Sequence, residues 1–393
     1  MSSHTQLNIF IKNIWLISLP TFKQMKTEQK RWLIICVVAT FFMFNSSCSK
    51  VVQGVPQVPC YFIFGDSLAD NGNNNRIATM ARADYLPYGI DFPRGSTGRF
   101  SNGKTVVDVI TELLGFNDYI QPYANVSGRE ILRGVNYASA AAGIRDETGQ
   151  QLGARISFGG QVNNYVTTVS HIVGILGNVN LAANHIKKCI FSIGLGSNDY
   201  LNNYFMRDYY DTSHRYTAKK YADALVQQYA KQIRILYNYG ARKFVFNGIG
   251  PIGCSPNSLA QYSQDGSTCI AKINSANQMF NRRLISLVDY FNENLPDAKF
   301  IYINNYGIFR DLINRPKNFG FRVTNKGCCG VGRNNGQITC LPFQTPCQNR
   351  NNYIFWDAFH PTEAASIIVA RRSYSAASST DVYPIDIRRL AQL

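Results

Sequence analysis

Short apolar runs recur along the chain and are typical of strands buried in a parallel sheet. Helices cover both faces of such a strand, so its residues form a nearly continuous apolar run and do not alternate with polar ones. Glycine, asparagine or charged residues, which favour turns, bound most of these runs. The predicted strands are Cys60–Gly65, Lys188–Ile193, Lys243–Phe246 and Lys299–Ile303.

The longer stretches between these runs carry apolar residues at helical spacing. One predicted helix begins at Thr217 and ends at Gly240, and its apolar face consists of Ala222, Leu225, Tyr229, Ile233 and Leu236. The other predicted helices are one that Asn102 caps and Gly115 stops, one from about Ile270 to Leu295, and one introduced by His360-Pro361-Thr362.

Strands that alternate with helices predict an α/β fold with a parallel sheet covered on both faces. The chain has no internal repeat and no low-complexity linker after residue 60, so we expect a single domain over residues 55–393. In such sheets, ligands bind beyond the carboxyl ends of the strands. Ser67 follows the first predicted strand and Asn198 follows the second, so both are expected at that edge.

Residues 1–54 resemble an extension with a targeting segment. Basic residues precede the apolar run Trp32–Phe44, and small residues follow it. This order is that of a secretory signal peptide, and the run is shorter than the roughly 20 residues of a membrane-spanning helix. We expect its removal within Asn45–Gly54, and a secreted, extracellular protein without an integral membrane span. Translation from either Met1 or Met25 fits this pattern.

Composition favours a packed globular protein over a disordered or nucleic-acid-binding one. Charged residues make up 16% and aromatic residues 13% of the 393 residues, whereas disordered chains are rich in charge and poor in aromatics. The formal net charge of +16 is spread without a dense basic run, so nucleic acid is not an expected partner. A basic secreted protein is suited to association with acidic cell-wall polysaccharide in the apoplast.

Eight of the ten cysteines lie beyond residue 54. An even number in a secreted chain favours disulfides, and we expect two or three, with the remaining thiols buried. The cluster Cys328, Cys329, Cys340 and Cys347 lacks the two-residue spacer of a zinc knuckle, so no metal site is expected. Asn125 begins the one glycosylation sequon beyond residue 54, in a polar stretch.

Three residues supply the groups that a serine nucleophile needs. Ser67 stands at a strand end, where its hydroxyl projects beyond the sheet. Asp357 and His360 are three positions apart, so the carboxylate can accept from Nδ1–H while Nε2 takes the serine proton. Asp108 and Asp199 are alternative orienting acids. Each motif alone is equally typical of a turn or a helix cap, and it is their order along one chain that predicts nucleophilic acyl chemistry.

A developing oxyanion also needs hydrogen-bond donors. The side-chain amide of Asn198 and the backbone N–H of Ser67 are candidate donors, although an asparagine at such a place is by itself more typical of a turn. The small residues of Gly134–Gly143 allow the backbone to approach a ligand closely.

Taken together, these residues resemble the plant GDSL esterase/lipase family of the SGNH hydrolases, over about residues 59–385. The motifs that carry the resemblance are Phe64–Asn74, Gly134–Ile144, Ile193–Tyr200 and Phe355–Thr362, with Gly250–Cys254 and Cys328–Gly330 as further signatures. The resemblance implies a flavodoxin-like three-layer α/β/α fold, a catalytic triad of Ser67, His360 and Asp357, and an oxyanion hole formed by Ser67, a glycine and Asn198.

The second motif departs from the family pattern. It has Ala140, Ala141 and Ala142 where glycines are common. The oxyanion glycine is therefore expected to be Gly143, with the backbone N–H of Ala141 as the alternative donor.

The sequence thus predicts a secreted carboxylic-ester hydrolase that works through an acyl-enzyme and needs no cofactor. Its substrate class, whether acyl lipid, cutin-like polyester, acetyl ester or phenolic ester, is left open. Two alternatives are an acyltransferase that uses the same acyl-enzyme, and a catalytically silent wall-binding or defence glycoprotein. Aromatic residues within 84–100 and 204–216 are candidates to line an acyl channel, although such residues more often pack within loops.

Overall fold

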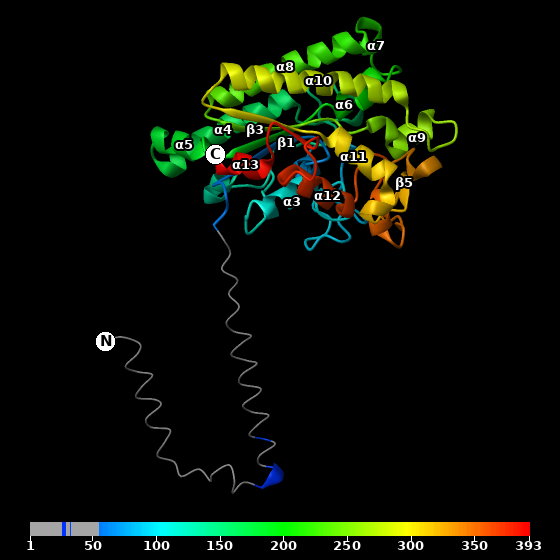
Figure 1. The fold of residues 1–393 in the computed structure, drawn as a ribbon, viewed down its shortest axis with the longest axis horizontal. Coiled ribbons are helices and arrows are strands. Elements are labelled where there is room, and N and C mark those ends of the chain that lie inside the picture. The colour runs from blue at the N-terminus through cyan, green and yellow to red at the C-terminus, as the bar shows by residue number, and fades with distance from the viewer. Residues whose placement is uncertain (1–25, 29–31, 33–54) are drawn as a thin grey trace. The chain divides into compact units, whose positions relative to one another are not determined.

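A five-stranded sheet in the order β1-β2-β3-β4-β7 organises Val55–Leu393 (Figure 1). This computed structural model describes residues 26–28, 32 and 55–393. The first four strands are parallel, and the last is an antiparallel edge. The strands are β1 (Tyr61–Gly65), β2 (Ile190–Gly194), β3 (Lys243–Asn247), β4 (Lys299–Ile303) and β7 (Val382–Tyr383). The four predicted strands are therefore confirmed, to within two residues at each end.

The segment Val135–Ser139 runs beside β1 as an irregular further strand. The Ile63 N–H donates to the Val135 carbonyl (3.0 Å), and the Ile63 carbonyl accepts from the Tyr137 N–H (2.8 Å). When this segment is counted and the strands are numbered in chain order, their order across the sheet is 2-1-3-4-5, which is the flavodoxin-like order. The order reverses at β1, so the crevice beyond the end of β1 is where such a sheet binds its ligand.

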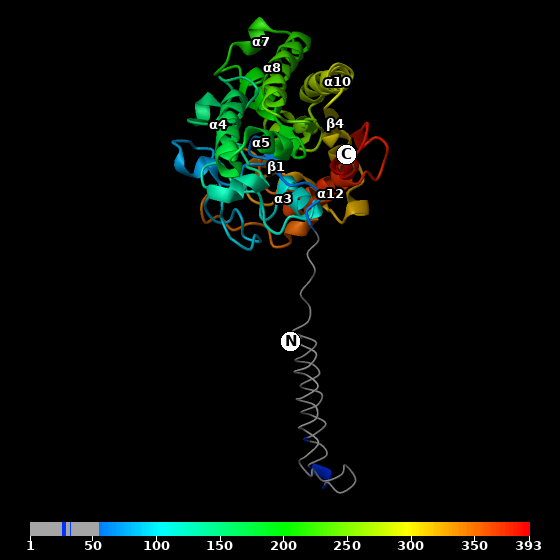
Figure 2. The same cartoon turned by 90° about the vertical axis from the view of Figure 1, so that its left-hand side faces the viewer.

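Two layers of helices cover the sheet, because alternate side chains of each strand face opposite sides. Phe62 and Phe64 of β1 belong to one apolar core and Tyr61 and Ile63 to the other. Figure 2 shows α4, α8 and α10 on one side of the sheet and α3 and α12 on the other. The first layer comprises α4 (Phe158–Leu176), α5 (Val179–Ile186), α8 (Ala218–Asn238) and α10 (Ala271–Asn294), and the second α3 (Val106–Leu113), α11 (Asn305–Asn314), α12 (Glu363–Tyr374) and α13 (Ile387–Gln392). The predicted three-layer α/β/α fold is thus confirmed.

Shorter elements follow the strands at the edge where the sheet ends. They are α6 (Ser197–Asp199), η4 (Tyr200–Tyr204), α7 (Thr212–Arg215), α9 (Pro256–Tyr262) and the two-stranded sheet of β5 (Val323–Gly327) and β6 (Tyr353–Phe355). No helix in the described ranges is both long and apolar enough to cross a membrane. The predicted signal segment lies outside the described residues, except for residues 26–28 and 32. The remainder, Val55–Leu393, is one compact unit.

The predicted cap of α3 is wrong. Thr105, and not Asn102, stands at the N-cap, where its N–H and hydroxyl both donate to the Asp108 carboxylate (2.9 and 2.8 Å). The Asn102 side chain instead donates to Asp91 and accepts from the Glu363 N–H, the first residue of α12. It therefore links α3's loop to α12. The predicted cap at Thr217 and the ends of α10 agree with the structure.

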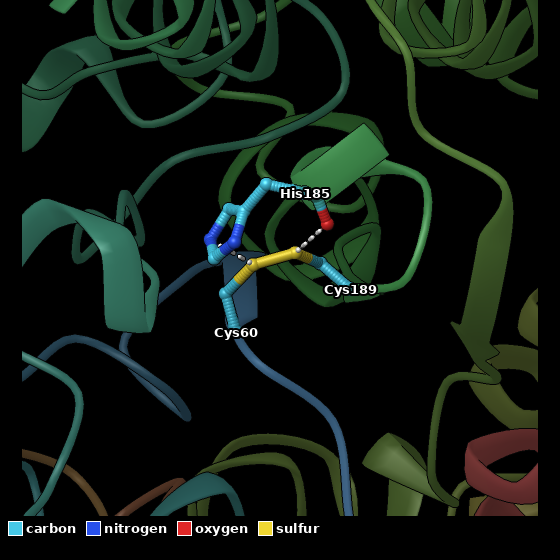
Figure 3. Close-up of side chains that lie close together, drawn as sticks. All are labelled: Cys60, His185 and Cys189. Carbon is cyan, nitrogen blue, oxygen red and sulfur yellow. Dashed lines mark hydrogen bonds between the residues drawn. A yellow bond between two sulfur atoms is a disulfide. The ribbon is translucent and has the colours of Figure 1, made fainter. Parts of the chain in front are cut away.

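All eight cysteines beyond residue 54 are paired in four disulfides, so the expectation of only two or three with free thiols is wrong. The pairs are Cys60–Cys189, Cys254–Cys269, Cys328–Cys347 and Cys329–Cys340. Cys60–Cys189 joins the residues just before β1 and β2. His185 lies beside it, with Nε2 3.3 Å from Cys60 Sγ (Figure 3). The same nitrogen lies 2.8 Å from the Leu132 carbonyl.

A third, smaller apolar core lies beneath the loop that follows β6. We call it the disulfide cluster. It consists of Ala83, Tyr88, Phe100, Ala140, Cys328, Cys329, Cys340 and Trp356. The Cys329 N–H donates to the Trp356 carbonyl (2.7 Å), and the Cys328 N–H donates to the Phe355 carbonyl (3.0 Å). Two disulfides are therefore attached to the backbone immediately before Asp357.

Candidate active site

Ser67, His360 and Asp357 form one hydrogen-bonded chain. The His360 Nε2 lies 2.7 Å from Ser67 Oγ, and His360 Nδ1 lies 2.8 Å from both Asp357 carboxylate oxygens. Asp357 is fully buried and His360 is 5% exposed, while Ser67 reaches the cavity described below. The structure thus brings the three sequence-predicted residues together in the order that a serine nucleophile requires.

The turn after β1 sets the position of Ser67. The Asp66 carboxylate accepts from the Leu68 N–H (3.0 Å), and the Asp66 carbonyl accepts from the Ala69 N–H (3.0 Å). Gly65 permits this turn, because a Cβ there would lie 3.1 Å from the Ala69 Cβ and 3.3 Å from the Gly194 carbonyl oxygen. The chain therefore turns away from the sheet directly before the nucleophile.

Asp66 is a second buried carboxyl beside the nucleophile. Its burial raises its pKa to about 6, although the Leu68 N–H and the charge of His360 act in the opposite direction. It lines the same cavity as Ser67. This group therefore changes its charge in a mildly acidic solution.

The turn from Asp357 to His360 holds the acid against the imidazole. Asp357 Oδ1 accepts from the backbone N–H groups of Phe359 (2.9 Å) and His360 (2.8 Å). Burial alone would raise the pKa of Asp357, but the charge and hydrogen bond of His360, with hydrogen bonds from Tyr88 and Phe359, hold it below its usual range. The acid is therefore ionised and oriented at neutral pH.

The other candidate acids and bases lie elsewhere. Asp108 forms a buried ion pair with Arg99, with N–O distances of 2.7 and 2.8 Å. Asp199 accepts from the N–H groups of Ile144 and Arg145 and from the Thr148 hydroxyl. Both carboxylates are thus occupied in structural roles. Of the remaining histidines, His171 and His214 are exposed, His185 lies beside the Cys60–Cys189 disulfide, and His4 lies outside the described residues.

Asn198 faces the cavity from α6, after β2. Its Nδ2 donates to the Ala142 carbonyl (2.9 Å), and its Oδ1 accepts from Asn202 Nδ2 (2.7 Å). An amide NH₂ carries two hydrogens, so one remains for a ligand. The two partners fix the amide orientation, which sequence reasoning left undefined.

The two backbone candidates of the second motif differ in position. Gly143 does not line the cavity; its carbonyl accepts from the Phe158 N–H, and a Cβ on it would meet Thr148 and Asp199. Ala141 does line the cavity, and its backbone has a φ of 64°. This left-handed conformation is rare for alanine. The geometry therefore favours the Ala141 N–H over that of Gly143 as an oxyanion donor.

Polar residues of the first motif fix the second motif beside it. The Asp70 carboxylate accepts from the Ala140 N–H (2.9 Å). The Asn73 side chain donates to the Asn136 and Ala138 carbonyls, and the Asn74 side chain donates to the Ala140 carbonyl. The amide-rich run that reads as a loop in the sequence thus holds the stretch that contains Ala141.

A cavity of about 740 Å³ opens above the triad. One apolar wall belongs to the core under α3 and α12, and the other to the core under α4 and α8. The first wall includes Val107, Ile110 and Val369, and the second includes Leu195, Phe205 and Ile249. The cavity therefore spans the end of the sheet and offers an apolar group space on both sides of it.

The aromatic residues of segments 84–100 and 204–216, predicted as candidates to line an acyl channel, have two different surroundings. Phe205 and Tyr209 line the cavity, as does Phe100. Tyr88 packs in the disulfide cluster and Tyr85 packs against that cluster, so these two are not channel residues. Asn125 is exposed, as a glycosylation site must be.

Comparison with known proteins shows extensive similarity. The family model described as GDSL-like Lipase/Acylhydrolase matches residues 61–373. The chain is 64% identical over 369 residues to GDSL esterase/lipase At1g29670 of Arabidopsis thaliana. This alignment covers 94% of this chain and 100% of that protein. It is 63% identical to GDSL esterase/lipase At4g18970 of the same species over 91% of this chain and 99% of that protein, and 46% identical to GDSL esterase/lipase 7 over 92% and 99%.

Proposed function

The chain belongs to the GDSL-like lipase/acylhydrolase family, whose members hydrolyse carboxylic esters, and we propose that it does so with Ser67 as nucleophile through an acyl-enzyme. The observation that carries the proposal is the contact chain from Ser67 through His360 to Asp357 at the mouth of the cavity. These three residues supply the nucleophile, the base and the acid that the proposed chemistry needs.

In the proposed first step, Ser67 Oγ attacks the ester carbonyl while His360 Nε2 takes its proton. Asp357 stabilises the imidazolium that forms. The N–H groups of Ser67 and Ala141 and the amide of Asn198 donate to the oxyanion. The imidazolium then protonates the departing alcohol. In the second step, water attacks the acyl-enzyme and the same groups act in reverse.

We propose that the ester carries an apolar acyl group longer than acetate. Both walls of the cavity are apolar, and its volume of about 740 Å³ lies within the range of pockets that bury whole small ligands. A chain that lies against Val107 and Ile110 would extend between the sheet and α3. A series of p-nitrophenyl esters from acetate to palmitate tests this. The highest kcat/KM is expected above acetate, and a maximum at acetate would contradict it.

The nucleophile is tested with Ser67→Ala. Its hydrolysis of p-nitrophenyl butyrate should fall to background, a loss of several orders of magnitude, and labelling by a fluorophosphonate probe should disappear. Ser286→Ala, on the exposed face of α10, is the control and should keep both properties. Wild-type turnover in Ser67→Ala would sink the proposal. Adding a competing alcohol shows whether acyl transfer competes with hydrolysis.

We further propose that Val55–Leu393 is the mature domain and that it acts outside the cell. The support is the charged, apolar and small-residue order within residues 1–54, the four disulfides and the exposed sequon at Asn125. Residues 1–54 hold six Lys/Arg and one Glu, so +11 of the chain's net charge of +16 belongs to Val55–Leu393. This charge would favour association with acidic wall polysaccharide. Endoglycosidase treatment of the protein expressed in plant cells should lower its apparent mass, and Asn125→Gln should abolish that change. An unchanged wild-type mass would contradict secretion with glycosylation.

A further inference from the structure

We infer that Tyr88 is a positioning residue of the triad, which holds the carboxylate of Asp357 through its hydroxyl. The inference rests on the proposed function, because it assigns Asp357 its role beside His360. Tyr88 lies 269 residues before Asp357 in the chain, and their side chains meet at 2.5 Å between the phenol oxygen and Oδ2. This is the shortest contact that the acid makes.

The two oxygens of Asp357 are held in different ways. Oδ1 accepts from two backbone N–H groups of its own turn, those of Phe359 and His360. Oδ2 accepts from Tyr88 and from the imidazole, and from no backbone group among the described residues. Among the described residues, Tyr88 is therefore the one group from outside the turn that hydrogen-bonds to the carboxylate and fixes its plane against His360.

The Tyr88 ring is itself immobilised. It is 1% exposed and packs edge-to-face on Phe100, Trp356 and Tyr85, with ring centroids 5.7, 6.3 and 5.4 Å apart. Its own carbonyl accepts from the Ser96 hydroxyl (2.6 Å). Phe100 also packs on the His360 ring at 4.9 Å. The disulfide cluster thus surrounds the phenol and also contacts the His360 ring through Phe100.

The surroundings of Tyr88 keep its phenol protonated, so that it can donate to Asp357. Burial and the charge of Asp357 hold the pKa of Tyr88 well above its ordinary value, so the hydroxyl stays protonated at every pH at which the protein works. A donor to an ionised carboxylate draws negative charge away from it and lowers its basicity. Two other titratable groups face the pair. Tyr85 faces Asp357 from the same loop, and Asp66 faces His360 from the turn after β1.

Tyr88→Phe tests the inference, because it removes the hydroxyl and keeps the ring. The carboxylate becomes more basic and less firmly held, so the triad keeps its proton to higher pH. We expect kcat/KM to fall about tenfold with little change in KM. The low-pH limb of the pH–rate profile should move up by about half a unit. Activity is followed by pH-stat from pH 4.5 to 9.

Tyr85→Phe is the matched control, since it removes a neighbouring phenol hydroxyl that donates to the Cys340 carbonyl (2.9 Å) and not to Asp357. It should lower Tm without moving the low-pH limb.

If Tyr88→Phe does not fold, Tyr88 is replaced by 3-fluorotyrosine. The more acidic phenol donates more strongly and should move the low-pH limb to lower pH. A Tyr88→Phe enzyme with the wild-type limb and kcat would overturn the inference. Activity in Ser67→Ala would instead overturn the proposed function, so the two failures are distinguishable.

Discussion

Gly65 at the end of β1 pairs in register with Gly194 at the end of β2. Both strands therefore stop at the same level, and the turns that follow them open into the same crevice. Ser67 comes from one turn and Asn198 from the other. The distance between nucleophile and candidate oxyanion donor is thus determined by strand register, which is among the most rigid relationships in a buried parallel sheet.

The amide of Asn198 is predicted to act in the transition state. Asn198→Ala should lower kcat about 10²–10³-fold with little change in KM. Asn202→Ala is the matched control, because it removes the donor that orients Oδ1, together with the Asn202 contact to Gln151 Nε2, while the Ala142 contact remains. It should cost less than about tenfold, since a neutral hydrogen bond has a smaller effect. Equal losses in the two variants would contradict a direct role for Asn198.

The backbone at Ala141 is predicted to carry strain. Its φ of 64° costs an L-residue about 1–2 kcal/mol, and Ala141→Gly relieves that cost. The variant also adds roughly 0.5–1 kcal/mol of chain entropy and loses a buried methyl of about 0.8 kcal/mol. The free energy of unfolding in urea should therefore stay within about 1 kcal/mol of the wild-type value, with activity kept because the N–H remains.

The control for Ala141 is its neighbour Ala142, which is fully buried and has no left-handed φ. Ala142→Gly loses a buried methyl and gains chain freedom, so it should destabilise by about 1–2 kcal/mol. A larger loss in Ala141→Gly than in Ala142→Gly would show that the backbone at residue 141 is not strained.

Asp66 is predicted to destabilise the fold at neutral pH. Its folded pKa is about 6, above the ordinary aspartate value of 3.8. Between these values, the folded state binds more protons than the unfolded state, so the stability contribution of this group is present at pH 4 and is lost as the pH rises through 6. Asp66→Asn should therefore raise the free energy of unfolding at pH 7 by about 1–3 kcal/mol. The gain should shrink towards pH 4, and equal gains at both pH values would refute the assignment.

Of two disulfides, one is predicted to matter more for stability and the other more for activity. Cys60–Cys189 spans 129 residues and Cys329–Cys340 spans 11. On loop entropy, replacing the first pair by alanine should cost about 5 kcal/mol and the second about 3 kcal/mol. The first lies at the opposite end of the strands from the triad, whereas the second packs with Trp356 next to Asp357. The Cys329/Cys340 variant should therefore lose more kcat, although the Cys60/Cys189 variant should have the lower Tm.

Much of the fold could be predicted because the strands are short and continuously apolar. The helix α8 was equally clear, since Thr217 and Gly240 bound it and its apolar residues recur at helical spacing. Helix α4 was not predicted. Its sequence contains glycine, asparagine and β-branched residues of low helix propensity. Burial of Phe158, Val162 and Tyr165 against the sheet stabilises it instead, and this tertiary effect is not visible in a local pattern.

The residues of the triad could be named because strand ends and a three-residue acid–histidine spacing are local features. Their surroundings could not. The contact of Tyr88 with Asp357 joins residues 269 positions apart, and the left-handed backbone at Ala141 depends on the fold around it. The number of disulfides was underestimated, because connectivity cannot be deduced from cysteine spacing alone. The sequence thus predicts the candidate reacting groups, which the structure brings together, and not the groups that position them.

The contact between Ser67 and His360 joins positions 293 residues apart. A nascent chain that has completed β1, β2, β3 and β4 already contains most of the strands of the sheet. It lacks the proposed acid and base until residues 357–360 have been translated and folded onto it. On the proposed triad, the protein is therefore expected to be inert during its own synthesis, and so is any product of premature termination before residue 357, however well it folds. Fluorophosphonate labelling of translation products would consequently mark only chains that have passed this point.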